Sequence, residues 1–168
     1  MTHVCQYTGP GCIPVLLRDR GTVYCHDISF AETSAAEEYE ASHAGAVALR
    51  AQTPQGLVAE LSALGVAIET VIHNDVHPNT PVPIEQIPLE MFRQSVDVLL
   101  LFPIELTQRL LPGMKAAKLG RFVFVTSARY RQPEAGFSVA TTIRAATTAF
   151  AQSLAREAAP DGIQVNVV

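Results

Sequence analysis

The stretch 121-RFVFVTS-127 is the part of the sequence that decides the fold. Its apolar residues stand on consecutive positions from Phe122 to Val125, which is typical of a parallel strand buried on both faces. Five further strand-like runs lie at residues 2–6, 22–26, 46–49, 68–73 and 163–168. Helix-like runs separate them, at residues 14–19, 34–43, 54–64, 89–118 and 139–159. This alternation predicts an α/β fold with a doubly wound parallel sheet, Rossmann-like and in three layers.

The composition limits the classes of protein. With 168 residues, 48% of them hydrophobic, we expect one domain over 1–168. A formal charge of −4 with scattered Lys and Arg excludes a nucleic-acid surface. No apolar run is long enough for a membrane span, and Met1–Cys5 lacks a secretory signal, so a cytoplasmic protein is expected. Cys5, Cys12 and Cys25 show no zinc or disulfide spacing and are interpreted as buried, reduced thiols.

Three features interrupt the regular pattern. Pro103 falls inside the run 89–118 and should kink or divide that helix. The proline-rich loop 75–88 follows the fourth expected strand, at the sheet edge where ligands bind in such folds, although a plain linker is the alternative. The run 163–168 resembles the start of a central strand. We therefore expect a sheet that is incomplete after the sixth strand, and a chain that is a fragment.

The first β-to-α turn is a poor nucleotide site. Such a site needs closely spaced glycines, because backbone N–H groups must approach a pyrophosphate. Here Gly9 and Gly11 stand without a third glycine, while Pro10 lacks an N–H and Tyr7 adds a bulky ring. A tight turn without ligand fits equally well. Asp27, after the second expected strand, could bind a ribose or cap the turn before Ser29.

Ser127 and Arg144 are the candidate catalytic pair. The serine ends a strand, and the arginine follows seventeen residues later inside the next helix, so the two can face one cleft. The serine would supply a hydroxyl donor, and the permanent charge of the arginine would lower the pKa of a nearby phenol and so prepare a base. On spacing alone, a strand terminus and a solvated helix face remain the alternative.

Across essentially its whole length the chain resembles the short-chain dehydrogenase/reductase superfamily. Its oxidoreductases carry a serine, a tyrosine thirteen residues later and a lysine four residues after that. Counting from Ser127 reaches Ala140 and Arg144. Arginine in place of lysine is similar to the halohydrin dehalogenase family. That family also replaces the glycine motif by Thr-x4-(Phe/Tyr)-x-Gly, which Thr2, Tyr7 and Gly9 match without a gap.

Two further segments resemble the same family, 22-TVYCHD-27 and 73-HND-75. The resemblance implies cofactor-free chemistry: a tyrosine takes the proton of a vicinal haloalcohol, the serine holds the substrate oxygen, and halide leaves to give an epoxide. Halide rests where a nicotinamide would lie. Ser127 would bind substrate, Arg144 would tune the base, and the pocket would be lined by Thr2, Tyr7, Gly9, Asn74, Asp75 and the loop 75–83. In the family, a loop after the sixth strand completes the halide pocket.

The resemblance breaks at Ala140, which stands where the motif has its tyrosine and carries no exchangeable proton. Loss of a general base costs a factor of about 10²–10⁴ in rate. Tyr130, three residues past Ser127, could lean into the cleft, although a surface tyrosine is the ordinary interpretation. Phe137 cannot replace the tyrosine, because it has no hydroxyl and Thr141 would then occupy the lysine position.

Three functions follow as hypotheses. The first is a halohydrin-dehalogenase-like lyase with no cofactor and no metal, which takes a haloalcohol, an epoxide and halide. The second is an NAD(P)-dependent oxidoreductase, disfavoured by the glycine turn and by Arg144. The third is a non-catalytic relative that assembles as a homodimer or homotetramer through the long runs 89–118 and 139–159, as is common in this superfamily.

Overall fold

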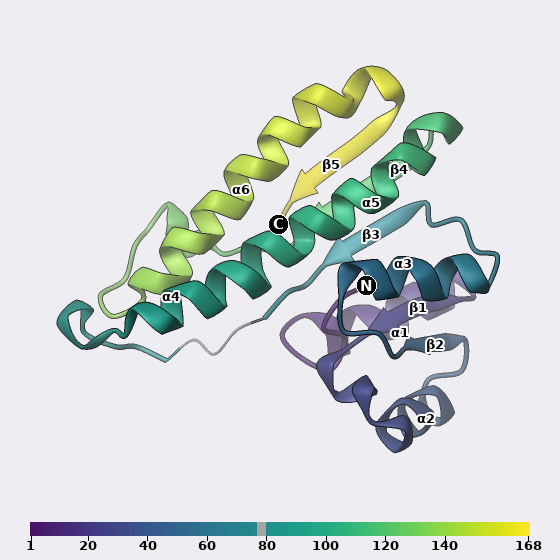
Figure 1. Cartoon of the computed structure of the whole chain (residues 1–168), viewed down its shortest axis with the longest axis horizontal. Coiled ribbons are helices and arrows are strands. Elements are labelled where there is room, and N and C mark those ends of the chain that lie inside the picture. The colour runs from purple at the N-terminus through teal and green to yellow at the C-terminus, as the bar shows by residue number, and fades with distance from the viewer. Residues whose placement is uncertain (77–79) are drawn as a thin grey trace.

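The computed structural model describes residues 1–76 and 80–168 and confirms a parallel α/β fold (Figure 1). The strands are β1 (Val23–His26), β2 (Ala46–Leu49), β3 (Thr70–His73), β4 (Gly120–Phe124) and β5 (Ile163–Val167). The helices are α1 (Gly9–Arg20), α2 (Thr33–Ser42), α3 (Pro54–Ala63), α4 (Leu89–Val96), α5 (Phe102–Ala117) and α6 (Ser138–Ala158). Pro78, one of the prolines of the loop predicted over a site, lies outside the described residues.

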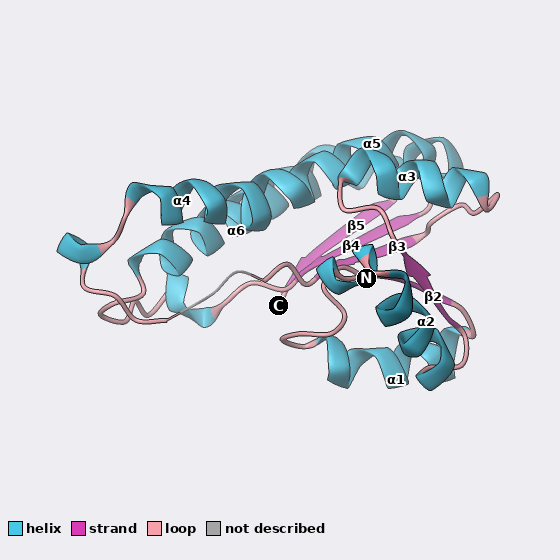
Figure 2. Cartoon of the chain, turned by 60° about the horizontal axis from the view of Figure 1, so that its bottom comes forward, coloured by secondary structure: helices cyan, strands magenta, loops and turns pink. Residues whose placement is uncertain are grey.

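The strands form two parallel groups, β1–β2 and β3–β4–β5. Phe122 of β4 stands opposite Val71 of β3 and Val165 of β5. Helices α3, α5 and α6 cover one face, α4 packs against α6 beyond the ends of the strands, and α1 and α2 cover the opposite face beside β1 and β2 (Figure 2). Phe122 and Phe124 have no exposed surface, whereas Arg121 and Val123, which point to the other face of β4, are half-buried. The consecutive apolar positions therefore predicted the strand, but it is fully buried on one face only.

The strand predicted at residues 2–6 is wrong. Only the segment Met1–Val4 lies between the two sheet groups, where the Thr2 N–H donates to the Ile72 carbonyl (3.0 Å) and the Val4 N–H to the His26 carbonyl (3.1 Å). The next amide, that of Cys5, donates instead to the Asp27 carboxylate at 3.0 Å. A side chain thus takes the backbone group that would have continued the ladder, and the chain turns into α1.

The helix predicted at residues 14–19 begins earlier, at Gly9. Pro10 lies in the first turn, where a missing N–H costs nothing because such groups have no partner within the helix. The other helix and strand bounds differ from the predicted ones by at most two residues, apart from the long run 89–118.

That run is divided, as Pro103 predicted. A π-helical turn, Asp97–Leu101, separates α4 from α5. Because Pro103 has no N–H, the carbonyl four residues earlier, that of Leu99, lacks its helical donor. The Thr147 hydroxyl of α6 donates to this carbonyl at 2.7 Å. The break therefore also fastens α6 to the α4–α5 junction.

The cysteine prediction is wrong for Cys5, which is exposed, while Cys25 is buried and Cys12 is intermediate. Cys5 is exposed because the chain leaves the sheet directly after Val4. No group of histidine, cysteine, aspartate or glutamate within residues 1–76 and 80–168 could hold a metal ion. Among the same residues, no helix is long and apolar enough to cross a membrane.

Candidate functional site

Arg144 fastens the carboxyl ends of two neighbouring strands. Its Nη1 donates to the Val125 carbonyl at 2.9 Å and its Nη2 to the Asp75 carbonyl at 2.7 Å. The side chain is buried, with 9% exposure. Burial lowers the pKa of Arg144 below its ordinary value while the Asp75 carboxylate opposes that change, and the guanidinium stays charged at neutral pH. The arginine is therefore a fixed positive charge at the sheet edge rather than part of a solvated helix face.

Asp75 lies buried between two histidines. Its Oδ1 is 3.2 Å from His3 Nδ1, and its Oδ2 is 3.6 Å from His73 Nδ1, beyond hydrogen-bond distance. Burial alone would raise the pKa of Asp75, but these two imidazoles outweigh burial and hold the pKa well below its usual range. Asp75 thus points its carboxylate into the protein, and only its backbone carbonyl meets Arg144.

Asn74 holds the loop that precedes α1. Its Nδ2 donates to the carbonyls of His3 (2.9 Å) and Gln6 (3.0 Å), and its Oδ1 accepts from the Thr8 hydroxyl at 2.6 Å. Its own backbone N–H donates to Thr2 Oγ1 at 2.9 Å. Thr2 and Asn74, both predicted as pocket residues, are buried and have these polar groups engaged. In this structure they shape the loop that carries Tyr7.

Tyr7 is the exposed residue of that loop. It has a positive φ of 54° and is 58% exposed, and its hydroxyl donates to the Thr126 carbonyl at 3.1 Å. The Arg144 guanidinium carbon lies 5.8 Å from the centroid of its ring. Tyr7 therefore bridges the start of α1 and the end of β4 directly over the guanidinium. The structure brings Tyr7 and Arg144 together, as the resemblance implied.

The first turn of α1 has few free backbone N–H groups that could bind a phosphate. Gly9 N–H donates to Gln6 O, Gly11 and Cys12 N–H donate to Thr8 O, and Pro10 has no N–H. A Cβ at Gly9 would collide with the Val4 carbonyl oxygen, so close approach of the backbone requires glycine there. Gly9 therefore serves the turn itself.

Asp27 caps the next turn. Its Oδ1 accepts from the N–H and the hydroxyl of Ser29 at 3.1 and 2.8 Å, while Oδ2 accepts from the Cys5 N–H. Burial would raise the pKa of Asp27, but these hydrogen bonds lower it overall. Of the two roles left open by the sequence, the structure supports capping.

Ser127 and Tyr130 line one cavity of about 510 Å³ beside β5. The Ser127 oxygen accepts from the Arg129 N–H at 3.2 Å. The Tyr130 hydroxyl accepts from Arg131 Nε at 2.7 Å, and Arg131 lines the same cavity. Tyr130 is thus half-buried beside the serine rather than a free surface residue.

Ala140 lies on α6 four residues before Arg144, one helical turn away. It lines a separate small hollow of about 20 Å³ with Val82, Met91 and Phe137. Ser127 and Ala140 share none of the cavities found among the described residues. Thr80 and Ser95 also line this hollow, among side chains that are otherwise apolar.

Sequence reasoning gave no role to His3, His73 or Arg131. In the structure His3 and His73 hold Asp75 from either side, and Arg131 binds Tyr130. His73 begins the segment 73-HND-75 that carries part of the resemblance, so a polar run at a strand end was the available signal. His3 gave none, because it lies 72 positions from its partner.

The comparisons place these features in a family. A sequence model described as short chain dehydrogenase matches residues 29–168. A solved structure titled "Dehalogenation enzyme" is 35% identical, with a TM-score of 0.92 over 99% of this chain and 68% of that one. A halohydrin dehalogenase bound to ethyl (2S)-oxiran-2-ylacetate is 27% identical, with a TM-score of 0.94 over 99% and 67% of the two chains.

A serine dehydrogenase from Escherichia coli, 15% identical, has a TM-score of 0.89 over 99% of this chain and 78% of that one, which shows the shared fold alone. No curated protein matches the chain. The family model matches well over half of the chain, and the structure titled "Dehalogenation enzyme" shares 35% of its sequence with it. The chain therefore belongs to the short-chain dehydrogenase family, and within that family it is similar to two dehalogenases.

Proposed function

We propose that the chain carries a lyase site that converts a vicinal haloalcohol into an epoxide and halide without a cofactor. In this reaction a base takes the hydroxyl proton, and the oxygen forms a bond to the neighbouring carbon. The carbon–halogen bond breaks at the same time, and halide leaves with the electron pair. No redox step occurs, so no nucleotide is needed.

The observation that carries the proposal is the closed first turn of α1. Its amides are bonded within the turn, and Tyr7 spans from that turn to the Thr126 carbonyl over Arg144. A pyrophosphate would have to displace these contacts. The likeness to two dehalogenases supports the same choice over an NAD(P)-dependent oxidoreductase.

Ser127 is the group that would hold the substrate oxygen. Its oxygen already accepts the Arg129 N–H, which leaves its own proton to donate into the cavity. Both terminal nitrogens of Arg144 already donate to backbone carbonyls. Arg144 would therefore stabilise the oxyanion through its positive charge rather than through a direct hydrogen bond. Tyr130 is the phenol that shares the cavity with Ser127, and we propose it as the base that remains while position 140 is alanine.

The proposal is tested by incubating the protein with a vicinal bromoalcohol and measuring the released halide by ion chromatography. Ala140→Tyr should raise the rate by a factor of about 10²–10⁴, because it restores a general base one turn from Arg144. Thr142→Tyr, exposed on the same helix, is the matched control and should leave the rate unchanged. Ser127→Ala and Tyr130→Phe should each reduce turnover of the unmodified chain.

The same variants belong in a chimera that adds the part of the dehalogenation enzyme beyond the matched 68%. Absence of halide release from Ala140→Tyr in both proteins would show that the site is not a lyase. Tight NADH binding, seen by fluorescence and by thermal shift, would overturn cofactor independence.

Assembly through the long helices is a further part of the proposal. Leu89 at the start of α4 and Leu101 at the π-helical turn are 69% and 50% exposed, which leaves apolar surface for a second copy. Light scattering should give the mass of a dimer or tetramer. A mass of one chain at all concentrations would contradict this part.

A further inference from the structure

The Asp75 carboxylate acts on the charge of Arg144, yet the two groups do not pair. Arg144 Nη2 donates to the backbone carbonyl of Asp75 at 2.7 Å, and Nη1 donates to the Val125 carbonyl at 2.9 Å. Both of these partners are neutral. The carboxylate affects Arg144 only through its charge, which raises the pKa that burial of the guanidinium lowers. The arginine therefore keeps an unpaired positive charge at the sheet edge.

A change of rotamer at Asp75 would end this arrangement. The carboxyl group belongs to the same residue as the carbonyl that accepts from Arg144, and rotation about the Cα–Cβ bond moves the carboxylate relative to that carbonyl. A carboxylate and a guanidinium form the strongest kind of hydrogen bond in proteins, and more so in a buried site. Asp75 is 2% exposed and Arg144 is 9% exposed. With these two residues alone, we expect the carboxylate to turn to the guanidinium.

Two histidines hold the carboxylate elsewhere. His3 Nδ1 lies 3.2 Å from Asp75 Oδ1, and His73 Nδ1 lies 3.6 Å from Oδ2, so each oxygen faces one imidazole. His73 Nε2 is 3.1 Å from the Thr107 hydroxyl, which can donate to it and so leave the ring proton on Nδ1, toward Asp75. His3 precedes α1 and His73 ends β3, so the carboxylate is held from two separate segments. It is thereby stabilised as an anion without help from the guanidinium.

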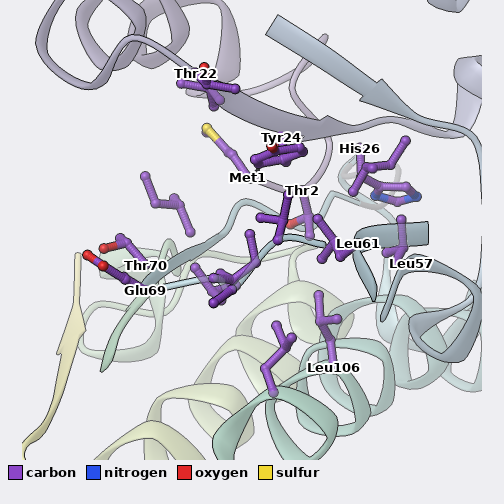
Figure 3. Close-up of a pocket in the computed structure, with 18 of the residues that line it drawn as sticks. Met1, Thr2, Thr22, Tyr24, His26, Leu57, Leu61, Glu69, Thr70 and Leu106 are labelled. Atoms are coloured by element: carbon purple, nitrogen blue, oxygen red, sulfur yellow. Dashed lines mark hydrogen bonds between the residues drawn. The ribbon is translucent and has the colours of Figure 1, made fainter. Parts of the chain in front are cut away.

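A further buried histidine, His26, does not hold the carboxylate. Among the described residues, neither of its ring nitrogens has a hydrogen-bond partner. Its ring stacks on Phe102 at a centroid distance of 5.4 Å and meets the His3 ring edge-on at 5.3 Å. Figure 3 shows His26 near Leu57, and both line a largely apolar cavity of about 310 Å³. Burial lowers the pKa of His26 to about 4, so at pH 7 it is a neutral wall behind the His3 ring.

We propose that His3 and His73 are positioning residues, which hold the Asp75 carboxylate away from Arg144 and so keep the guanidinium charge available to an anionic group in the cleft. In the lyase proposed above, that group is the oxyanion from which the epoxide forms, and this clause rests on the proposed function. Neither histidine touches the substrate. The place of the carboxylate can be measured without turnover.

Crystal structures of variants show directly where the carboxylate lies. The double variant His3→Leu/His73→Leu removes both imidazoles, and we expect an Asp75 carboxylate oxygen about 2.7–2.9 Å from an Arg144 nitrogen. His3→Asn/His73→Asn keeps an N–H group in the place of each Nδ1, so the carboxylate should stay where it is. His26→Phe is the matched control, because it removes a similarly buried imidazole that has no hydrogen bond to Asp75. There too the carboxylate should stay.

The double variant decides between the possible results. If its carboxylate stays in place, the histidines do not hold it and the proposal is wrong. If the double variant folds only after Asp75→Asn is added, the carboxylate found no new partner, which overturns the proposal as well. If it does not fold in either form, His3→Ala decides instead, because it removes the closer imidazole and leaves room for water. A carboxylate that then remains beside His73 would contradict the proposal.

Halide release separates positioning from stability. In the variant whose carboxylate has turned, kcat should fall about tenfold or more with KM little changed, because the charge near the developing oxyanion is neutralised. Adding Asp75→Asn to the same variant should restore kcat, and absence of recovery would assign a purely structural role to the histidines. If neither the unmodified chain nor Ala140→Tyr releases halide, the proposed function fails, while the crystal structures still show whether His3 and His73 position Asp75.

Discussion

Arg144→Met is the substitution that best separates structure from chemistry at this site. Methionine keeps an apolar stem of similar length but removes the donors to the Val125 and Asp75 carbonyls, both of which belong to buried residues. A buried carbonyl left without a donor costs about 1–3 kcal/mol, so two of them lower the free energy of unfolding by about 2–6 kcal/mol. At about 2–4 °C per kcal/mol for a chain of this size, Tm should fall by roughly 4–24 °C.

Urea denaturation followed by far-ultraviolet circular dichroism measures this loss. Arg156→Met is the matched control, because Arg156 is exposed on the same helix and should change the free energy of unfolding by at most about 0.5 kcal/mol. Arg144→Lys should fall between the two, since one ammonium cannot reproduce the guanidinium fork. If Arg144→Met is as stable as Arg156→Met, the guanidinium does not fasten β3 to β4 and our reasoning is refuted.

Three further outcomes are expected. Gly9→Ala should lower the free energy of unfolding by about 1–3 kcal/mol, because its Cβ would collide with the Val4 carbonyl. Gly11→Ala, whose Cβ would have no atom within 4 Å, should leave the stability unchanged or raise it. Equal effects of the two substitutions in thermal melts would contradict this. Burial lowers the pKa of His26 from 6.5 to about 4, so the unfolded chain binds the extra proton between these values and stability should fall as pH drops, by at most about 1.4 kcal/mol per unit. His26→Phe should flatten that slope in urea titrations, and an unchanged slope would assign it to other groups. Asn74→Ala should lower the free energy of unfolding by about 2–4 kcal/mol and should speed amide hydrogen exchange in residues 3–8. If exchange there stays slow, other contacts hold the loop.

The parallel fold could be predicted from the sequence because its signal is local. Consecutive apolar residues at 122–125 predict a parallel strand, and in the structure Phe122 and Phe124 are fully buried while Val123 between them is half-buried. Pro103 predicted the break in the long helix for a similar reason, because its missing N–H removes a hydrogen bond to a carbonyl only one turn away. The partner that makes the break tolerable, Thr147, lies 48 positions from Leu99 and gave no signal in the pattern.

The error at residues 2–6 has a long-range cause. The Cys5 amide is taken by Asp27, and the His3 carbonyl by Asn74, 71 positions away. Neither contact could be inferred from the apolar pattern of five residues. A strand signal says that a segment can pair, whereas the side chains around it decide how far pairing continues.

For the candidate site as well, the sequence predicts the features within one element but not the contacts between distant segments. The spacing of Ser127, Ala140 and Arg144 is a property of one strand and one helix, so the sequence contains it. The contacts of Tyr7 with Thr126 and Arg144 join segments more than a hundred positions apart, and only the resemblance to a family indicated them. The sequence leaves open whether Tyr130 leans into the cleft or lies on the surface, because the Arg131 contact and the shared cavity depend on how the turn after β4 folds.

Arg144 explains why alanine can stand at position 140 without loss of the site's framework. The guanidinium bonds to two neutral carbonyls, and the nearest carboxylate, Asp75, turns its oxygens toward His3 and His73. Its charge is therefore held in place by the strands and does not depend on a phenol. A lysine would have one nitrogen to share between two carbonyls and a substrate, whereas the fork of arginine satisfies both carbonyls and keeps its field directed at the cleft. Removal of the tyrosine thus takes away the proton carrier and leaves intact the charge that would activate a new one.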